Sequence, residues 1–164
     1  MGEVPATIET ALKKEKPNVT YILCSDYQLA YIYKGYSKPN REVVQEAARK
    51  ANAKVIFRRC DIFSLESINN TIRGILKVID PYGDEVTINY TGGSAPVRLF
   101  LGVLGVGLSR ICPKTKVLYA IHYPKDVKMA ANQTNKLQEF LPTDLGLLLS
   151  FVEKRSQSKR PRQR

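Results

Sequence analysis

The sequence is poor in the residue types that build metal sites and disulfide frameworks. It has one histidine, His122, and three cysteines, Cys24, Cys60 and Cys112, which lie far apart and form no CxxC pair. Structural zinc sites and disulfide frameworks need clustered or regularly spaced ligands, so neither is indicated. We therefore expect three buried thiols, no metal and no cofactor.

Long apolar segments are also missing. The most apolar run, Leu99 to Leu108, has ten residues, which is about half the length that a helix needs to cross a bilayer. The first fifteen residues lack the apolar core of a secretory signal peptide. We expect a cytoplasmic protein with no membrane partner.

Patterns of hydrolase chemistry are missing as well. The acidic residues show no paired spacing, no Ser-His-Asp order emerges, and His122 has no assignable carboxylate partner. His122 ends an expected strand, where a structural or surface role is favoured over that of a general base. Catalytic residues stay unassigned.

Acidic residues are few compared with basic ones. The chain has 26 Lys and Arg residues against 15 Asp and Glu residues, which gives a formal net charge of +11. Residues 143–164 are predicted to form a C-terminal helix and a basic, disordered tail, since six basic residues and one acidic residue follow from Glu153 onward. The basic body suits a polyanionic partner such as DNA or RNA, but solubility alone explains it equally well.

Strand and helix patterns alternate along the chain. Strands are predicted at 19–24, 54–58, 86–90 and 116–122, helices at 8–16, 39–51, 64–79, 94–110 and 145–152, and a short element at 135–141. The strand at 19–24 is apolar nearly throughout, as in strands buried on both faces. The alternation predicts one α/β domain with a largely parallel central sheet, whose ligands bind outside the carboxyl ends of the strands.

Two of these carboxyl ends carry polar residues suited to a ligand. Ser25 and Asp26 follow the first strand, and the TGGS turn, residues 91–94, follows the third. Its glycines permit positive φ, Ser94 suits a helix N-cap, and a helix N-terminus can hold an anion. Arg98, one turn into the helix, can reach back to such an anion. The alternative is a plain strand-to-helix turn with Arg98 in solvent, since neither a GxGxxG fingerprint nor a P-loop is present.

The helix after this turn contains three glycines, Gly102, Gly105 and Gly107, which cost helix stability. Their presence indicates that another element approaches the helix closely. We favour close approach within the fold, and a partner helix in a dimer is the alternative.

The segment NYTGGSAPVRLFLGVLGVGLSR resembles the signature of the CRISPR-associated Rossmann-fold (CARF) domains, N-x-TGG-[TS]-x-x-M followed by a small-residue helix. The matching residues are Asn89, Thr91, Gly92, Gly93 and Ser94, and the likeness extends over residues 8–125. The N-terminal domain of archaeal CARF regulators is similar.

The resemblance implies a Rossmann-like three-layer sandwich over residues 1–142. It also implies a homodimer that binds a cyclic oligoadenylate messenger of type III CRISPR antiviral defence across its two-fold axis. The implied ligand-binding residues are Ser25, Asp26, Thr91, Gly92, Gly93, Ser94 and Arg98.

The chain departs from the family pattern at two places. Ala95 stands where many members have a lysine, and Arg98 can supply that charge only from one turn away. The family also begins with a strand before the helix expected at 8–16, and no strand pattern precedes it here. We expect this to leave a gap beside the strand that carries the TGGS turn.

Three functions are compatible with these features. The first is a non-catalytic sensor of cyclic oligoadenylate. The second is a ring nuclease that cleaves cyclic tetra-adenylate without metal by positioning a ribose 2′-OH, with Ser25, Ser94 and Arg98 as orienting residues. The third is a basic DNA- or RNA-binding regulator that uses its body and tail.

Overall fold

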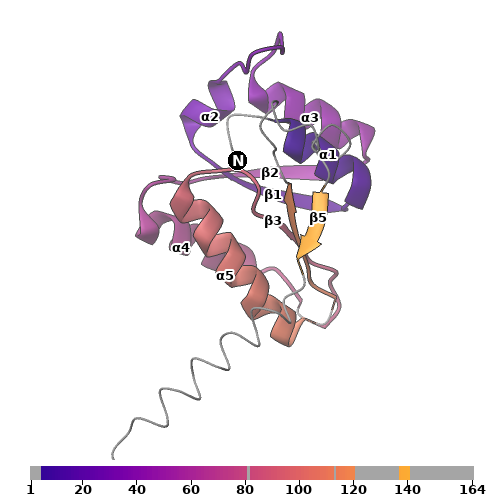
Figure 1. The fold of residues 1–164 in the computed structure, drawn as a ribbon, viewed down its shortest axis with the longest axis vertical. Helices are drawn as coiled ribbons and strands as arrows, with labels where there is room; N and C mark the ends of the chain where they lie inside the picture. Colours follow the sequence, from indigo (N-terminus) through magenta and orange to yellow (C-terminus); the bar gives the residue numbers. More distant parts are fainter. Residues whose placement is uncertain (1–4, 81, 113, 121–136, 141–164) are drawn as a thin grey trace, which may run out of the picture.

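The computed structural model describes residues 5–80, 82–112, 114–120 and 137–140, and they form a mixed α/β structure (Figure 1). The elements follow in the order α1 (Ala6–Glu15), β1 (Val19–Cys24), α2 (Asp26–Ala30), α3 (Asn40–Lys50), β2 (Lys54–Arg59), α4 (Leu65–Leu76), β3 (Thr87–Asn89), α5 (Ala95–Ile111), β4 (Lys116–Ala120) and β5 (Leu137–Phe140). The alternation of strands and helices predicted from the sequence is confirmed.

The described strands form two sheets, where one parallel sheet was expected. β1 pairs with β2 in parallel, with Val19 opposite Lys54. β3 pairs with β4 in parallel, and β4 pairs with β5 in antiparallel. Among the described strands, β3 has a ladder partner on one side only, β4. β3 spans three residues, so few ladder hydrogen bonds define it.

β1 is buried on both faces over residues 22–24, whereas Val19 is exposed and Thr20 and Tyr21 are half-buried, so the predicted burial holds for its second half. Successive side chains of a strand point to opposite faces. Ile22 and Cys24 therefore join one core cluster, and Leu23 joins the other. The first cluster takes residues from α2 and α3, and the second from α4 and α5, which lie on opposite sides of β1 in Figure 1. Burying each such aliphatic side chain stabilises the fold by about 1.5–3 kcal/mol.

Short-range signals explain where the helices begin. Ser64 and Ser94 are the N-cap residues of α4 and α5, as predicted. The five-residue α2 was not predicted, although a capping box between Ser25 and Gln28 fixes its start. α4 ends at Leu76, earlier than the predicted residue 79.

The three glycines of α5 have different surroundings. A Cβ at Gly105 would lie 2.7 Å from Cγ2 of Val117 on β4, whereas a Cβ at Gly102 or Gly107 would meet nothing within 4 Å. Close approach within the fold, predicted for all three, is thus correct for Gly105 and wrong for the other two.

Some predictions fall outside the described residues. These are His122, the helix at 145–152 and the basic tail from residue 153. The short element predicted at 135–141 corresponds to β5 over its described residues 137–140. Within the described part of the chain, no helix is long and apolar enough to cross a membrane.

Candidate functional site

Three segments meet at the carboxyl ends of β1, β2 and β3. The N–H of Cys60 donates to the carbonyl of Cys24, which joins the β2–α4 loop, residues 60–63, to the end of β1. The hydroxyl of Ser94 donates to the carbonyl of Ile62, which joins the same loop to the TGGS turn. The β2–α4 loop therefore lies between the two segments that the sequence singled out.

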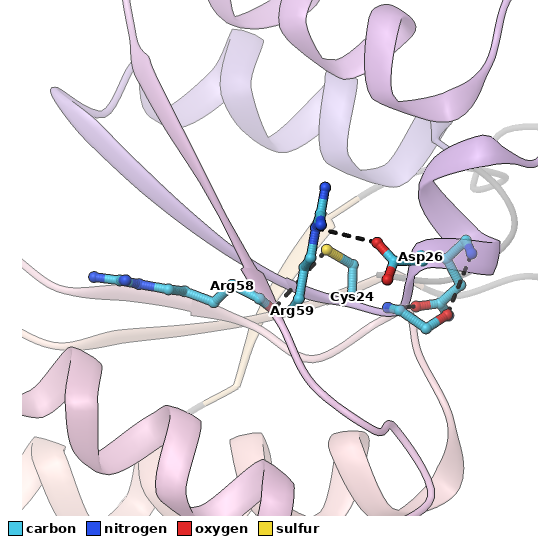
Figure 2. A network of polar contacts seen from close by, with 6 residues as sticks. Cys24, Asp26, Arg58 and Arg59 are labelled. Carbon is cyan, nitrogen blue, oxygen red and sulfur yellow. Dashed lines mark hydrogen bonds and ion pairs between the residues drawn. The ribbon is translucent and has the colours of Figure 1, made fainter.

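Ser25 and Asp26 are held by local and cross-strand contacts at the end of β1. The Ser25 hydroxyl accepts from the N–H of Gln28, and the Gln28 side chain accepts from the N–H of Ser25, at 3.2 and 3.1 Å. Oδ1 of Asp26 lies 3.1 Å from Nε of Arg59 on β2, and both side chains are exposed (Figure 2). Such an exposed pair contributes about 1 kcal/mol or less, so Arg59 can be released to a ligand at little cost.

Asn89 organises the TGGS turn. Its Oδ1 accepts from the N–H of Thr91 at 3.1 Å and from the Thr91 hydroxyl at 2.6 Å. Gly93 has a φ of +109°, whereas Gly92 does not have a positive φ. An L-residue at position 93 would cost about 1–3 kcal/mol of backbone strain, so the backbone angle favours glycine there.

Three helices that begin at this edge have serine as their N-cap residue, but they use it differently. The hydroxyls of Ser25 and Ser64 accept from backbone N–H groups in the first turns of α2 and α4. Ser94 makes no such bond to α5, and its hydroxyl donates to the carbonyl of Ile62. The first turn of α5 therefore keeps N–H groups that its own cap residue does not satisfy, and these carry the positive end of the helix dipole.

Arg98 lies in the first turns of α5 and is exposed. Its backbone N–H donates to the carbonyl of Ser94, so the residue begins the regular hydrogen bonding of the helix. Within the described residues no acidic side chain lies within ion-pair distance of the Arg98 guanidinium. Its charge is available to an anion at the TGGS turn.

Sequence reasoning missed several residues at this edge. Arg59 pairs with Asp26, and the guanidinium of Arg58 lies 5.5 Å from the centroid of the Tyr21 ring. Phe63, in the β2–α4 loop, is 74% exposed, which is unusual for a phenylalanine. Two sequence features could have identified these residues. They are the pair of arginines at the end of β2 and the Asp-Ile-Phe sequence in the loop that follows.

Burial disfavours the thiolate form of the two cysteines in this region. Burial raises the pKa of the Cys24 thiol to about 11, and it also raises the pKa of Cys60. The Cys24 thiol donates to the carbonyl of Arg58 at 3.9 Å (Figure 2). The expectation of buried thiols holds for Cys24 and Cys112, whereas Cys60 is half-buried.

The arrangement can bind an anion but offers no visible acid–base pair. It combines the uncapped start of α5 with the cations Arg59 and Arg98 and the exposed ring of Phe63. In the described ranges no cluster of His, Cys, Asp and Glu could hold a metal ion. Comparison with protein-family models gave no match, and a search of the curated proteins found no similar sequence.

Proposed function

We propose that the protein is a homodimeric, CARF-like sensor that binds a cyclic oligoadenylate at the TGGS turn in type III CRISPR antiviral defence. The observation that carries this proposal is that the Ser94 side chain does not cap α5. Of the three serine N-caps at the edge, Ser94 alone leaves the first turn of its helix without a side-chain cap. A helix N-terminus whose cap side chain does not occupy its N–H groups favours the binding of phosphate oxygens.

The chemistry of the ligand suits the residues around the turn. A cyclic oligoadenylate presents phosphates within its ring and adenines around it. The N–H group of Ala95 and the charge of Arg98 match phosphates, whereas Pro96 has no N–H to offer and Val97 is fully buried. The exposed ring of Phe63 offers a face on which an adenine can stack.

The proposal includes a Rossmann-like three-layer sandwich over residues 1–142. It is supported by β1, whose two faces are covered by α1–α3 and by α4–α5 respectively. In this view the sheets β1–β2 and β3–β4–β5 are two parts of one central layer, with the candidate site at their shared carboxyl edge.

The proposed homodimer forms through the exposed face of α5. Leu99 and Val103, which are 64% and 66% exposed, lie one turn apart on this face. Gly102 and Gly107 have open space above them, so a second helix can approach the backbone closely. A two-fold dimer would place two TGGS turns around one symmetric ring.

The sensor is preferred to the ring nuclease for a reason of geometry. Of the three orienting candidates for cleavage, Ser25, Ser94 and Arg98, the two serines have hydroxyls engaged within the fold, with Gln28 and Ile62. No contact of either residue favours cleavage, so the proposed function is binding.

The test compares two aspartate substitutions at glycines with similar backbone angles. Gly93→Asp places a carboxylate at the TGGS turn, whereas Gly35→Asp places one in the loop between α2 and α3, where φ is +95° and nothing lies within 4 Å. Binding of cyclic tetra-adenylate is measured by isothermal titration calorimetry. We expect Gly93→Asp to weaken binding about 10- to 100-fold, the effect of losing one charge-assisted hydrogen bond.

The control substitution distinguishes damage to the binding site from the effects of backbone strain and added charge. Gly35→Asp carries the same charge and similar strain, and we expect it to bind as the wild-type protein does. Equal losses in the two variants would remove the TGGS turn as the binding site. Linear products after incubation with the wild-type protein would make it a ring nuclease instead of a sensor.

A further inference from the structure

A second hollow lies on the helical layer formed by α1 and α3, apart from the TGGS turn. This α1–α3 groove is bounded by α1, by α3 and by the loop of residues 35–38, and its volume is about 690 Å³. Lys13, Lys16, Lys38 and Lys50 line it, and the apolar side chain of Val43 is part of its surface. The volume is within the range of sites that hold drug-sized ligands.

The acidic side chains of the groove are already engaged. The Tyr36 hydroxyl donates to Oε2 of Glu9 at 2.7 Å, and Lys38 forms an ion pair with Glu46. Burial and the Glu9 carboxylate raise the pKa of Tyr36 to about 12, so its hydroxyl stays protonated and donating at neutral pH. These two contacts fasten the loop to both helices and hold the groove open.

The remaining lysines of the groove have no acidic partner. Within the described part of the chain, no carboxylate lies within ion-pair distance of Lys13, Lys16 or Lys50. On α1, Glu15 pairs with Lys14 and Lys116, whereas Glu9, which lines the groove, accepts a hydrogen bond from Tyr36. Four lysines line the groove against two carboxylates, Glu9 and Glu46, so the lining carries a net charge of +2.

The positive surface continues beyond the groove. Arg49 precedes Lys50 in the last turn of α3, and Lys54, the first residue of β2, donates its N–H to the carbonyl of Asn18 near the end of α1. All three basic side chains are exposed. A run of like charges of this kind attracts a chain of phosphates more strongly than it attracts a single anion.

We propose that the α1–α3 groove binds the phosphate backbone of single-stranded nucleic acid. Lysines on two facing walls suit a flexible strand that can enter between them, whereas a duplex is too wide for a hollow of this volume. The lysine ammonium groups contact phosphates without reading base sequence.

The test uses the full chain and two triple variants matched in charge and position. Lys13→Gln/Lys16→Gln/Lys50→Gln removes the groove lysines, which occupy the last turns of α1 and α3 and the C-cap of α1. The control removes three basic residues from the last turns of α4 and α5 and from the C-cap of α4, as Arg73→Gln/Lys77→Gln/Arg110→Gln. Both variants lower the net charge by the same amount.

Binding of a fluorescein-labelled twelve-nucleotide oligo(dT) is followed by fluorescence anisotropy between 50 and 200 mM NaCl. Each lost phosphate contact lowers the salt slope for single strands by about 0.7, so we expect the groove variant to lose about 2 from the slope. The same relation gives roughly a 100-fold loss of affinity near 0.1 M salt, and we expect the control variant to bind nearly as the wild type does.

Three results would overturn the proposal. The first is equal weakening in the two triple variants, which would mean that net charge or the basic tail makes the contact. The second is duplex binding as tight as that of the single strand, and the third is equal competition by poly-glutamate of the same charge. Circular dichroism and thermal unfolding verify that both variants fold. We expect the groove variant to bind cyclic tetra-adenylate normally, so this proposal and the proposed function stand or fall separately.

Discussion

The close contact between α5 and β4 at Gly105 gives a sharp prediction about stability. In the interior of a helix, Gly→Ala is favourable by about 0.8–1.0 kcal/mol. At Gly105 the added Cβ would lie 2.7 Å from Cγ2 and 3.2 Å from Cγ1 of Val117, so the helix or the strand has to move. Overfilling a core costs about 1–3 kcal/mol, so we expect Gly105→Ala to destabilise the protein by up to about 2 kcal/mol.

The matched control for this substitution is Gly107→Ala in the same helix. A Cβ there meets nothing within 4 Å, so the intrinsic helix preference remains and the monomer should become more stable by up to about 1 kcal/mol. The two variants are compared by urea unfolding and by thermal unfolding. For a chain of this length, 1 kcal/mol corresponds to a change in Tm of about 2–4 °C.

A double-mutant cycle identifies the contact that is responsible. Val117 is 1% exposed, so Val117→Ala alone leaves a cavity and destabilises the fold. In the Gly105→Ala background the same change also relieves the clash, so its cost should fall by more than about 0.5 kcal/mol. The reasoning is refuted if Gly105→Ala stabilises the protein as much as Gly107→Ala does.

Two further predictions concern the hydroxyl of Tyr36 and the face of α5. The pKa of Tyr36 is raised to about 12 from 10.0, so this group contributes stability that is present below pH 10 and lost as pH rises toward 12. Urea midpoints at pH 9 and pH 11.5 should therefore differ less in Tyr36→Phe than in the wild type, and an unchanged difference would contradict this. Val103→Glu should convert the proposed dimer to a monomer in light scattering, whereas Val78→Glu, at a similarly exposed position after α4, should not. Dimers in both variants would exclude the α5 face.

The elements fixed by local signals were predictable from the sequence. Val19–Cys24 is bounded by Pro17 on one side and by polar residues on the other, and its predicted limits are the observed ones. Ser64 and Ser94 were predicted as N-caps because a serine preceded an apolar helical pattern. The capping box that starts α2 has a readable Ser-x-x-Gln pattern at residues 25–28 and was overlooked among the tyrosines that follow.

The features that depend on long-range pairing were not predictable. The hydroxyl of Ser94 bonds a carbonyl 32 residues away, so its failure to cap α5 cannot be read from the residues next to it. Asp26 and Arg59 meet only because β1 and β2 pair in one particular register. The division of the strands into two sheets depends in the same way on which strand edges meet. The sequence predicted where the site residues lie along the chain, but it did not predict the contacts that they make.

The most direct test of the central claim is the stoichiometry of cyclic tetra-adenylate binding to the wild-type protein. Isothermal titration calorimetry and light scattering on the same sample give the number of rings for each pair of chains. A homodimeric sensor with one TGGS turn per chain predicts one ring per two chains, lost on Gly93→Asp and kept on Gly35→Asp. No heat of binding at concentrations of ring well above those of the protein would contradict the claim, as would one ring bound to each separate monomer.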